Sequence, residues 1–359
     1  IHLDRAQGGT VKSLIAKAVD GKEFVDATSK RKFNELRGNF YKKGGFKTNT
    51  SKPAKIEVLE NGPYLVSVKV ESEIAGNPVS QTISLKQGEA LIDFDLKINW
   101  KENEGIGEFE ETNYQNTSLH KAFYNDQYKL LTLFPLALRN QKVFKDAPFD
   151  VTESKLENTF FSTWDNIKNN IMLNWVDVLS DDEKYGMAMF TDHTTSYAHG
   201  KNFPLGLTTQ YSGQGLWGRQ YKIDQPTSIS YQLMPHKGNW LQSNVSYQNE
   251  QIKEPLKANL IVSKPKVWSN SFIETSLKSL EVTSCTFDGE DLYLRVFNAS
   301  KTPNKGSVVL NFNASDVAFV NLNGSAATKA KVTDLVNNGK EVALSLRPFE
   351  IATLKISAK

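Results

Sequence analysis

Apolar and polar residues alternate without a break over residues 92–100. A β-strand points successive side chains to opposite faces of its sheet, so this period of two predicts a strand with one packed face and one polar face. Such a strand is typical of an antiparallel sheet layer. The apolar positions are Ile92, Phe94, Leu96, Ile98 and Trp100, and the polar positions are Asp93, Asp95, Lys97 and Asn99.

Further strand signals run through the rest of the chain. Residues 64–71 alternate in the same way, residues 129–138 form an apolar run, and residues 174–240 hold several aromatic-rich strands. Turn signals separate a second set of short strands after residue 282, at the spacing typical of a β-sandwich. Residues 29–53 are charged and without a period, and we predict a long loop there.

The composition fits a folded protein and disfavours two classes of partner. Apolar residues make up 39% and aromatic residues 11% of the 359 residues, which is ample for a packed core. The net charge of +3 is small and the basic residues are scattered, so we expect no nucleic-acid partner. No apolar run reaches the roughly 18 residues of a spanning helix, so we expect no membrane partner.

The cysteine content and the first residues leave the cellular compartment open. Cys285 is the one cysteine, so an internal disulfide is impossible, and both the cytoplasm and a bacterial periplasm or exterior are permitted. Residues 1–5 hold no signal peptide and read like the end of a strand. We therefore expect a fragment of a longer chain.

Short motifs follow one another in a fixed order within residues 174–240. Trp175-Val176-Asp177 comes first, Tyr185-Gly186 then opens a hydrophobic run, and residues 235–240 read Pro-His-Lys-Gly-Asn-Trp. This order resembles the C-terminal half of the family 38 glycoside hydrolases, the α-mannosidases.

Motifs outside this stretch extend the resemblance over nearly the whole chain. Residues 99–102 match the family's Asp/Asn-Trp-x-Glu signature, residues 129–138 resemble its Leu-Phe-Pro-Leu strand, and residues 347–354 resemble its Pro-Phe-Glu-Ile ending. Residues 147–150 depart from the family pattern, because Asp150 stands where glycine is usual and no Arg-Pro pair follows.

The resemblance implies an all-β fold in two parts. Residues 1–257 are expected to form a galactose-mutarotase-like antiparallel supersandwich. Residues 258–281 are expected to be a linker, and residues 282–359 a small terminal β-sandwich.

The resemblance also implies a function. Enzymes of this family are zinc-dependent retaining α-mannosidases, which hydrolyse terminal α-mannosyl residues. Their aspartate nucleophile, and the two histidines and two aspartates that hold zinc, lie upstream in a catalytic α/β half. None of these residues carries over, so we expect a non-catalytic portion without catalytic residues, metal ligands or a cofactor of its own. Its implied partners are that catalytic half and α-mannosides or mannose-containing glycans, and its role is to support the catalytic domain and shape the sugar site.

The loop at residues 210–220 is the most functional-looking segment. It is rich in glycine, polar and aromatic residues, a mixture typical of loops that contact sugars. We predict Tyr211, Gln214 and Arg219 as substrate-binding residues. A purely structural loop, with Trp217 in the core, remains the alternative.

The histidines suggest two metal sites, and for each we compare metal binding with a structural role in a turn or loop. His2-Leu3-Asp4 has the H-x-D spacing of the family's first zinc pair, but it precedes a turn and does not follow an apolar strand. Asp192, His193 and His199 could supply three ligands to a zinc ion, but we expect them to be exposed polar loop residues. We expect His236 to be a hydrogen-bonded residue at a strand end, not an acid or base.

Two other functions stay open. An autonomous carbohydrate-binding module would need an exposed aromatic platform and would bind mannosides without zinc. A mutarotase-like enzyme would need two histidines and a glutamate in a sheet concavity, and no matching motif is present. A large apolar patch where the catalytic half docks would favour the fragment interpretation over both.

Overall fold

The computed structural model describes residues 1–108, 125–154, 171–214, 220–260, 262, 271–336 and 338–358. None of the helices in these ranges is long and apolar enough to cross a membrane. The chain divides into two compact units. The first holds Ile1–Ala147 and Thr152–Ser243, and the second holds Pro148–Val151 and Asn244–Lys359.

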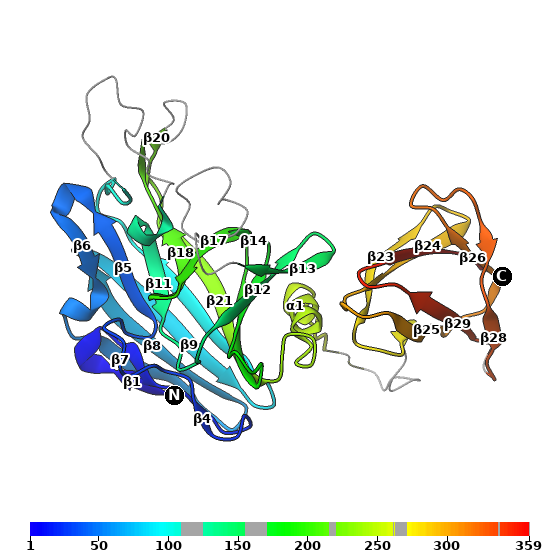
Figure 1. The fold of residues 1–359 in the computed structure, drawn as a ribbon, viewed down its shortest axis with the longest axis horizontal. Coiled ribbons are helices and arrows are strands. Elements are labelled where there is room, and N and C mark those ends of the chain that lie inside the picture. Colours follow the sequence, from blue (N-terminus) through cyan, green and yellow to red (C-terminus); the bar gives the residue numbers. More distant parts are fainter. Residues whose placement is uncertain are drawn as a thin grey trace. The chain divides into compact units, whose positions relative to one another are not determined.

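Unit 1 is built from two large antiparallel sheets (Figure 1). The two sheets share one hydrophobic core. The nine-stranded sheet contains, in spatial order, β13 (Asp150–Ser154), β12 (Lys142–Ala147), β15 (Trp175–Leu179), β16 (Tyr185–Thr191), β21 (Thr227–Lys237), β10 (Ile92–Ile98), β9 (Asn77–Lys86), β8 (Leu65–Ile74) and β7 (Lys55–Asn61). The six-stranded sheet contains β14 (Ile171–Met172), β17 (Thr195–Gly200), β18 (Phe203–Gln210), β11 (Leu130–Phe134), β5 (Glu35–Phe40) and β6 (Gly45–Thr48).

Short elements complete unit 1. They are the strand pairs β1 (His2–Asp4) with β2 (Thr10–Ser13), β3 (Ile15–Ala16) with β4 (Lys22–Glu23), and β19 (Gly213–Gln214) with β20 (Gln220–Tyr221), and the 3-10 helices η1 (Arg5–Gln7), η2 (Tyr41–Lys43), η3 (Asn49–Ser51) and η4 (Asp126–Tyr128).

Strand β10 confirms the strand predicted from the alternation at residues 92–100. Its apolar side chains are buried in the core, whereas Asp95 and Lys97 are exposed. The strand pairs with β9 on one side and with β21 on the other. One amphipathic strand thus joins two neighbours that lie far apart in the sequence.

A closed triangle of hydrogen bonds lies in the core between the two sheets. The Tyr231 hydroxyl donates to Asn34 Oδ1 at 2.6 Å and accepts from Gln81 Nε2 at 2.7 Å, and Asn34 Nδ2 donates to Gln81 Oε1 at 2.7 Å. Burial raises the pKa of Tyr231 well above its usual value, so its hydroxyl stays protonated. The Tyr231 ring also stacks on Phe94, with ring centroids 4.9 Å apart. Each bond satisfies a group that would otherwise be buried without a partner.

Two strands, β5 and β6, occupy the range 29–53, where we predicted a long loop, and that prediction was wrong. Leu36 and Phe40 of β5 are buried, and the strand pairs with β11. Gly38 lies between them because a Cβ at this position would lie 3.0 Å from Leu130 Cα. Because Gly38 takes one of the inward positions of the strand, the period of two is not visible in the sequence.

Unit 2 contains helix α1 (Val245–Lys253) and a small β-sandwich with its own hydrophobic cluster. Strand β22 lies inside residues 258–281, the range we predicted as a linker, and pairs with β25. Helix α1 was not predicted from the sequence. The four-stranded sheet contains β22 (Ile273–Thr275), β25 (Asn304–Leu310), β29 (Lys340–Leu346) and β28 (Val332–Asp334), and the five-stranded sheet contains β23 (Leu280–Phe287), β24 (Asp291–Asn298), β30 (Ile351–Ala358), β26 (Ala314–Val320) and β27 (Thr328–Lys329).

The two units confirm the predicted fold class. The chain is all-β, with a galactose-mutarotase-like antiparallel supersandwich followed by a small terminal β-sandwich. In both units the apolar strand faces are buried between two sheets, which is how a sheet with one hydrophobic face excludes water.

The substitution Tyr231→Phe should lower the free energy of unfolding of unit 1 by about 2 kcal/mol, because it leaves Asn34 and Gln81 each with an unpaired buried atom. Urea unfolding followed by circular dichroism measures this loss. Tyr64→Phe makes the same chemical change at a side chain that is 77% exposed, and it should have an effect below about 0.5 kcal/mol. Equal losses in the two variants would contradict the role given to the triangle.

Candidate functional site

The motifs of residues 175–240 meet in one buried contact. Nε2 of His236 lies 2.9 Å from Oδ1 of Asp177, and both side chains are buried. The other ring nitrogen of His236 lies 2.7 Å from Ser243 Oγ and 3.1 Å from Gly238 O. His236 is therefore a hydrogen-bonded residue at the end of β21, as predicted. Oδ2 of Asp177 has no hydrogen-bond partner among the described residues.

Gly186 makes this contact possible. It lies in β16, between β15 and β21, and is paired with His236. A Cβ at this position would lie 2.3 Å from His236 Cε1, so glycine lets the imidazole cross β16 to reach Asp177. Trp175 and Trp240 contact each other nearby, with ring centroids 6.2 Å apart. The motif residues thus form a structural clamp across three strands.

The segments 210–214 and 220–223, which we call the arm, carry two of the predicted sugar-contacting residues. Tyr211 contacts Tyr221 with ring centroids 5.4 Å apart, and Lys129 Nζ lies 4.8 Å from the centroid of the Tyr211 ring. Burial raises the pKa of Tyr211, so its hydroxyl stays protonated at neutral pH. The ring is therefore held in place as a neutral aromatic surface.

Tyr211 lies just before β19, and Gln214 lies in β19, where it pairs with Gln220 of β20. Arg219 and Trp217 lie outside the described residues. The substrate contacts predicted for Tyr211, Gln214 and Arg219 therefore stay predictions.

The first segment of the arm is tied to the loop at residues 99–106. Ser212 Oγ donates to Glu104 O and accepts from Ile106 N at 2.9 Å. Ser212 N donates in turn to Ile106 O at 2.8 Å. These bonds fix the backbone of the arm where it leaves β18.

Further bonds hold both segments of the arm at their roots. Asn103 Oδ1 accepts from Ile223 N at 2.8 Å. Trp100 Nε1 and Gln210 Nε2 both donate to Thr227 Oγ1, at 2.9 Å and 2.8 Å. The tryptophan of the Asn-Trp-x-Glu signature and the first residue of the arm thus share one acceptor at the start of β21.

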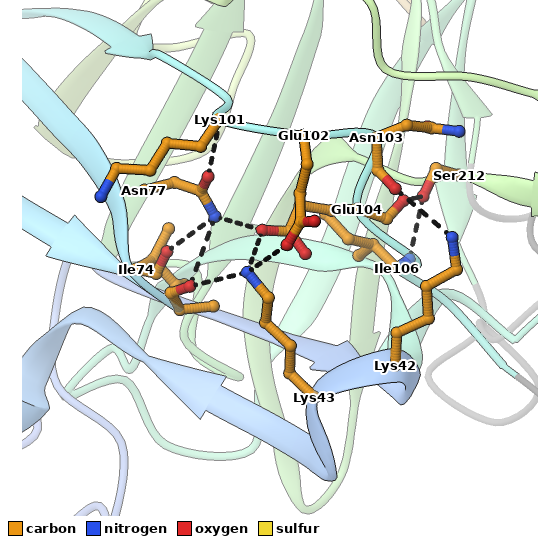
Figure 2. Close-up of polar contacts among 11 residues, drawn as sticks. Lys42, Lys43, Ile74, Asn77, Lys101, Glu102, Asn103, Glu104, Ile106 and Ser212 are labelled. Atoms are coloured by element: carbon orange, nitrogen blue, oxygen red, sulfur yellow. Dashed lines mark hydrogen bonds and ion pairs between the residues drawn. The ribbon is translucent and has the colours of Figure 1, made fainter.

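A buried carboxylate, Glu104, holds the 99–106 loop in place (Figure 2). Lys43 Nζ pairs with Glu104 Oε1, and Asn77 Nδ2 donates to the same oxygen at 2.6 Å. Lys43 also lies 3.0 Å from Glu102 Oε1. Burial lowers the pKa of Lys43, but its hydrogen bonds to the two carboxylates more than offset this, and the net pKa is raised. The lysine therefore stays charged and keeps the loop closed over η2.

The candidate metal ligands do not come together. His193 Nδ1 lies 2.5 Å from Asp192 Oδ1 on the surface, but His199 lies in β17 and is only 1% exposed. We predicted an exposed loop residue at His199, and this was wrong because the segment joins the six-stranded sheet. Asp4 caps η1 by accepting from Ala6 N at 3.0 Å. Over the described ranges, no group of three or more His, Cys, Asp or Glu side chains is placed to hold a metal ion.

His199 makes a contact that no sequence pattern indicated. Its Nε2 lies 2.7 Å from Gln141 Oε1, although the two residues are 58 positions apart. Gln141 Nε2 donates to the carbonyl oxygens of Leu136 and Leu138 at 3.1 Å and 3.2 Å. Burial lowers the pKa of His199 to about 4, so the imidazole is neutral at pH 7. These residues line a pocket of about 610 Å³.

Two protein-family models match the chain, and both describe the same family. The model of the glycosyl hydrolases family 38 C-terminal domain matches residues 36–208, which lie mostly in the supersandwich. The model of the family 38 C-terminal β-sandwich domain matches residues 271–354, in the small sandwich. The chain belongs to glycosyl hydrolase family 38 and corresponds to its C-terminal domains, as the sequence motifs predicted.

Solved structures agree with this assignment in fold. An α-mannosidase from Enterococcus faecalis V583 aligns with a TM-score of 0.64 and 14% identity, over 96% of this chain and 41% of that chain. A family 38 glycosyl hydrolase protein from Enterococcus faecalis aligns with a TM-score of 0.62 and 14% identity, over 96% and 42%. This chain therefore spans about two fifths of the length of each relative. No curated protein sequence matches it.

The substitution Glu104→Ala should lower the free energy of unfolding by about 3 kcal/mol, because it leaves Asn77 and Lys43 without the carboxylate that is 1% exposed. The matched control is Glu102→Ala. Its side chain is 63% exposed, so the loss should stay below about 1 kcal/mol. Urea unfolding of both variants distinguishes them, and equal losses would argue against the buried anchor.

The contribution of His199 to the free energy of unfolding should fall as the pH drops from 6.5 toward about 4. In this window the unfolded chain protonates His199 and the folded chain does not, so the unfolded state gains protons and stability decreases with falling pH. The loss attributable to this residue is at most about 3 kcal/mol.

Urea titrations across this pH range, on the unmodified chain and on His199→Gln, measure that contribution. The variant should lose less stability on acidification. His193→Gln removes an exposed imidazole that lies outside the core, and it should keep the original pH dependence. An unchanged pH dependence in His199→Gln would show that this residue is not the group that titrates.

Proposed function

We propose that this chain is the non-catalytic C-terminal portion of a zinc-dependent, retaining α-mannosidase. The parent enzyme hydrolyses terminal α-mannosyl residues, and this portion supports the catalytic half and shapes the rim of its sugar site. Membership of family 38 supports the proposal, as does the likeness in fold to an α-mannosidase of which this chain spans 41%. The remaining length of such an enzyme accommodates a separate catalytic half.

The buried carboxylates of the described residues support a non-catalytic role. Each contacts a hydroxyl, an amide, an imidazole or an ammonium group of its own unit. A retaining glycosidase needs two carboxyl groups about 5 Å apart that both reach the sugar. Carboxylates sealed in structural contacts do not meet that need. They are Glu35, Glu104, Asp126, Asp146, Asp177 and Asp291.

Zinc belongs to the catalytic half in this proposal. The described parts of this chain contain no group of three or more suitable side chains for a metal ion. The resemblance assigns the zinc ligands, two histidines and two aspartates, to the α/β half.

The observation that carries the substrate-shaping role is the anchored arm. Buried hydrogen bonds hold its root to the 99–106 loop, and Glu104 holds that loop. A rigid root positions the exposed part of a loop for binding. In the proposal, the ring of Tyr211 packs on a sugar face, and Gln214 and Arg219 bind sugar hydroxyls.

An apolar patch at one end of the nine-stranded sheet suits the partner domain. Val58, Tyr64, Val66 and Leu85, which we call the docking patch, are 62%, 77%, 40% and 36% exposed. Val66 pairs directly with Leu85, and β7 with Val58 is the next strand. Clustered exposed apolar side chains mark interaction surfaces. We assign this patch to the catalytic half.

Hydrolysis of an aryl α-mannoside tests the proposal. The purified chain, with and without added zinc, should give no turnover above buffer. The resemblance assigns the nucleophile and the zinc ligands to the catalytic half, and the described residues of this chain include no group of three or more side chains placed to hold a metal ion. Addition of the separately prepared catalytic α/β half should produce zinc-dependent turnover. A complete family 38 α-mannosidase serves as the positive control, and zinc-dependent turnover by this chain alone would overturn the proposal.

Substitutions in the docking patch sharpen the same assay. Val66→Glu places a charge in the patch and should weaken association with the catalytic half by about tenfold or more. Lys97→Glu changes the charge on the exposed face of β10 and is the matched control. Equal activity of both variants in the mixture would show that the docking patch is not the contact surface.

A further inference from the structure

The pocket beside His199 is separate from the arm. It is lined by the turn between β17 and β18 and by the loop that follows β11. The pocket includes Phe203 at the start of β18, and the arm begins at Gln210 at its end. With a rise of about 3.3 Å per residue, these positions are roughly 23 Å apart. The volume of about 610 Å³ falls in the range of small-molecule sites.

The hydrogen bonds around Gln141 fix the tautomer of His199. The carbonyl oxygens of Leu136 and Leu138 only accept, so the amide nitrogen of Gln141 faces them and its oxygen faces His199 Nε2. Nε2 therefore carries the proton, and Nδ1 keeps an unprotonated lone pair. Among the described residues, Nδ1 has no hydrogen-bond partner, and a buried acceptor in this state calls for a donor.

The lining of the pocket favours a neutral ligand. Its charged members among the described residues are one carboxylate, Asp26, and one ammonium, Lys201. An anion finds no excess of positive charge here, and its acceptor oxygens would face the lone pair of His199. Pro135 and Phe203 add apolar surface. A saccharide matches this mixture, because it offers hydroxyl donors together with apolar C–H faces.

We propose that this pocket binds a neutral saccharide, one hydroxyl of which donates to Nδ1 of His199. Nδ1 is closed to solvent in this structure. The proposal therefore includes a shift of the exposed turn residues Lys201 and Asn202, which line the pocket, to admit the hydroxyl. Gln141 is a positioning residue, because it holds the imidazole through Nε2. The proposal goes beyond the arm and the parent activity, since binding here requires neither catalysis nor the catalytic half.

Nitrogen NMR of the chain labelled with ¹⁵N-histidine reads Nδ1 directly. The probes are methyl α-mannoside, methyl α-glucoside and methyl α-galactoside, each titrated into the chain alone. At least one should move the His199 Nδ1 resonance upfield in a saturable way, as acceptance of a hydrogen bond does, and leave the other histidines in place. No shift with any probe overturns the proposal. The proposal is also overturned if the chemical shift of Nδ1 already shows a hydrogen bond before any probe is added, because a water would then occupy this position.

Two further probes test the ligand class. Sodium sulfate offers acceptors only and should leave the Nδ1 resonance unchanged. Glycerol offers hydroxyls without a sugar ring and should respond at least tenfold more weakly than the best glycoside. A sulfate response, or a glycerol response equal to that of the glycosides, would overturn the assignment to saccharides.

The variant His199→Gln keeps a donor toward Gln141 but lacks the acceptor at the position of Nδ1. It should bind the best glycoside about tenfold more weakly in calorimetry, the effect of one lost hydrogen bond. His193→Gln is the control and should bind as the unmodified chain does. Equal binding by the two variants would overturn the role of His199. If His199→Gln fails to fold, the NMR titration of the unmodified chain still decides.

Discussion

The closed triangle of Asn34, Gln81 and Tyr231 is the interaction on which the supersandwich most depends. It joins the residue before β5 in one sheet to β9 and β21 in the other. A slip of either sheet by one residue would turn these side chains away and break all three bonds. Strand β21 also carries His236 and begins where the arm is anchored. The register of β21 in the core therefore also fixes the position of His236 opposite Gly186 and of Thr227 at the root of the arm.

Buried polar contacts lie at one family motif and close to another in this part of the molecule. Asp177 meets His236 across Gly186, and Glu104 meets Lys43 beneath the loop that holds the arm. Loss of one partner from such a contact is costly because the other is left desolvated. These contacts make the domain rigid where it carries a loop.

Strict patterns in the sequence predicted the fold well, and irregular ones did not. The alternation at residues 92–100 gave β10 because every second side chain enters the core. The ordered motifs placed the chain in its family. Strand β5 was missed because Gly38 interrupts its apolar face between Leu36 and Phe40. His199 was misplaced because a polar residue enters a core only when a distant partner, here Gln141, is present to meet it.

The sequence by itself determined that the chain is all-β, that it has two sandwich parts and that it belongs to family 38, since period, turn residues and motif order are local properties. Only the tertiary structure decided which polar side chains meet. The partners in the core triangle lie up to 197 positions apart, and His199 and Gln141 lie 58 apart. No local pattern records such a pairing, because the geometry that satisfies a buried donor or acceptor exists only once the sheets have packed.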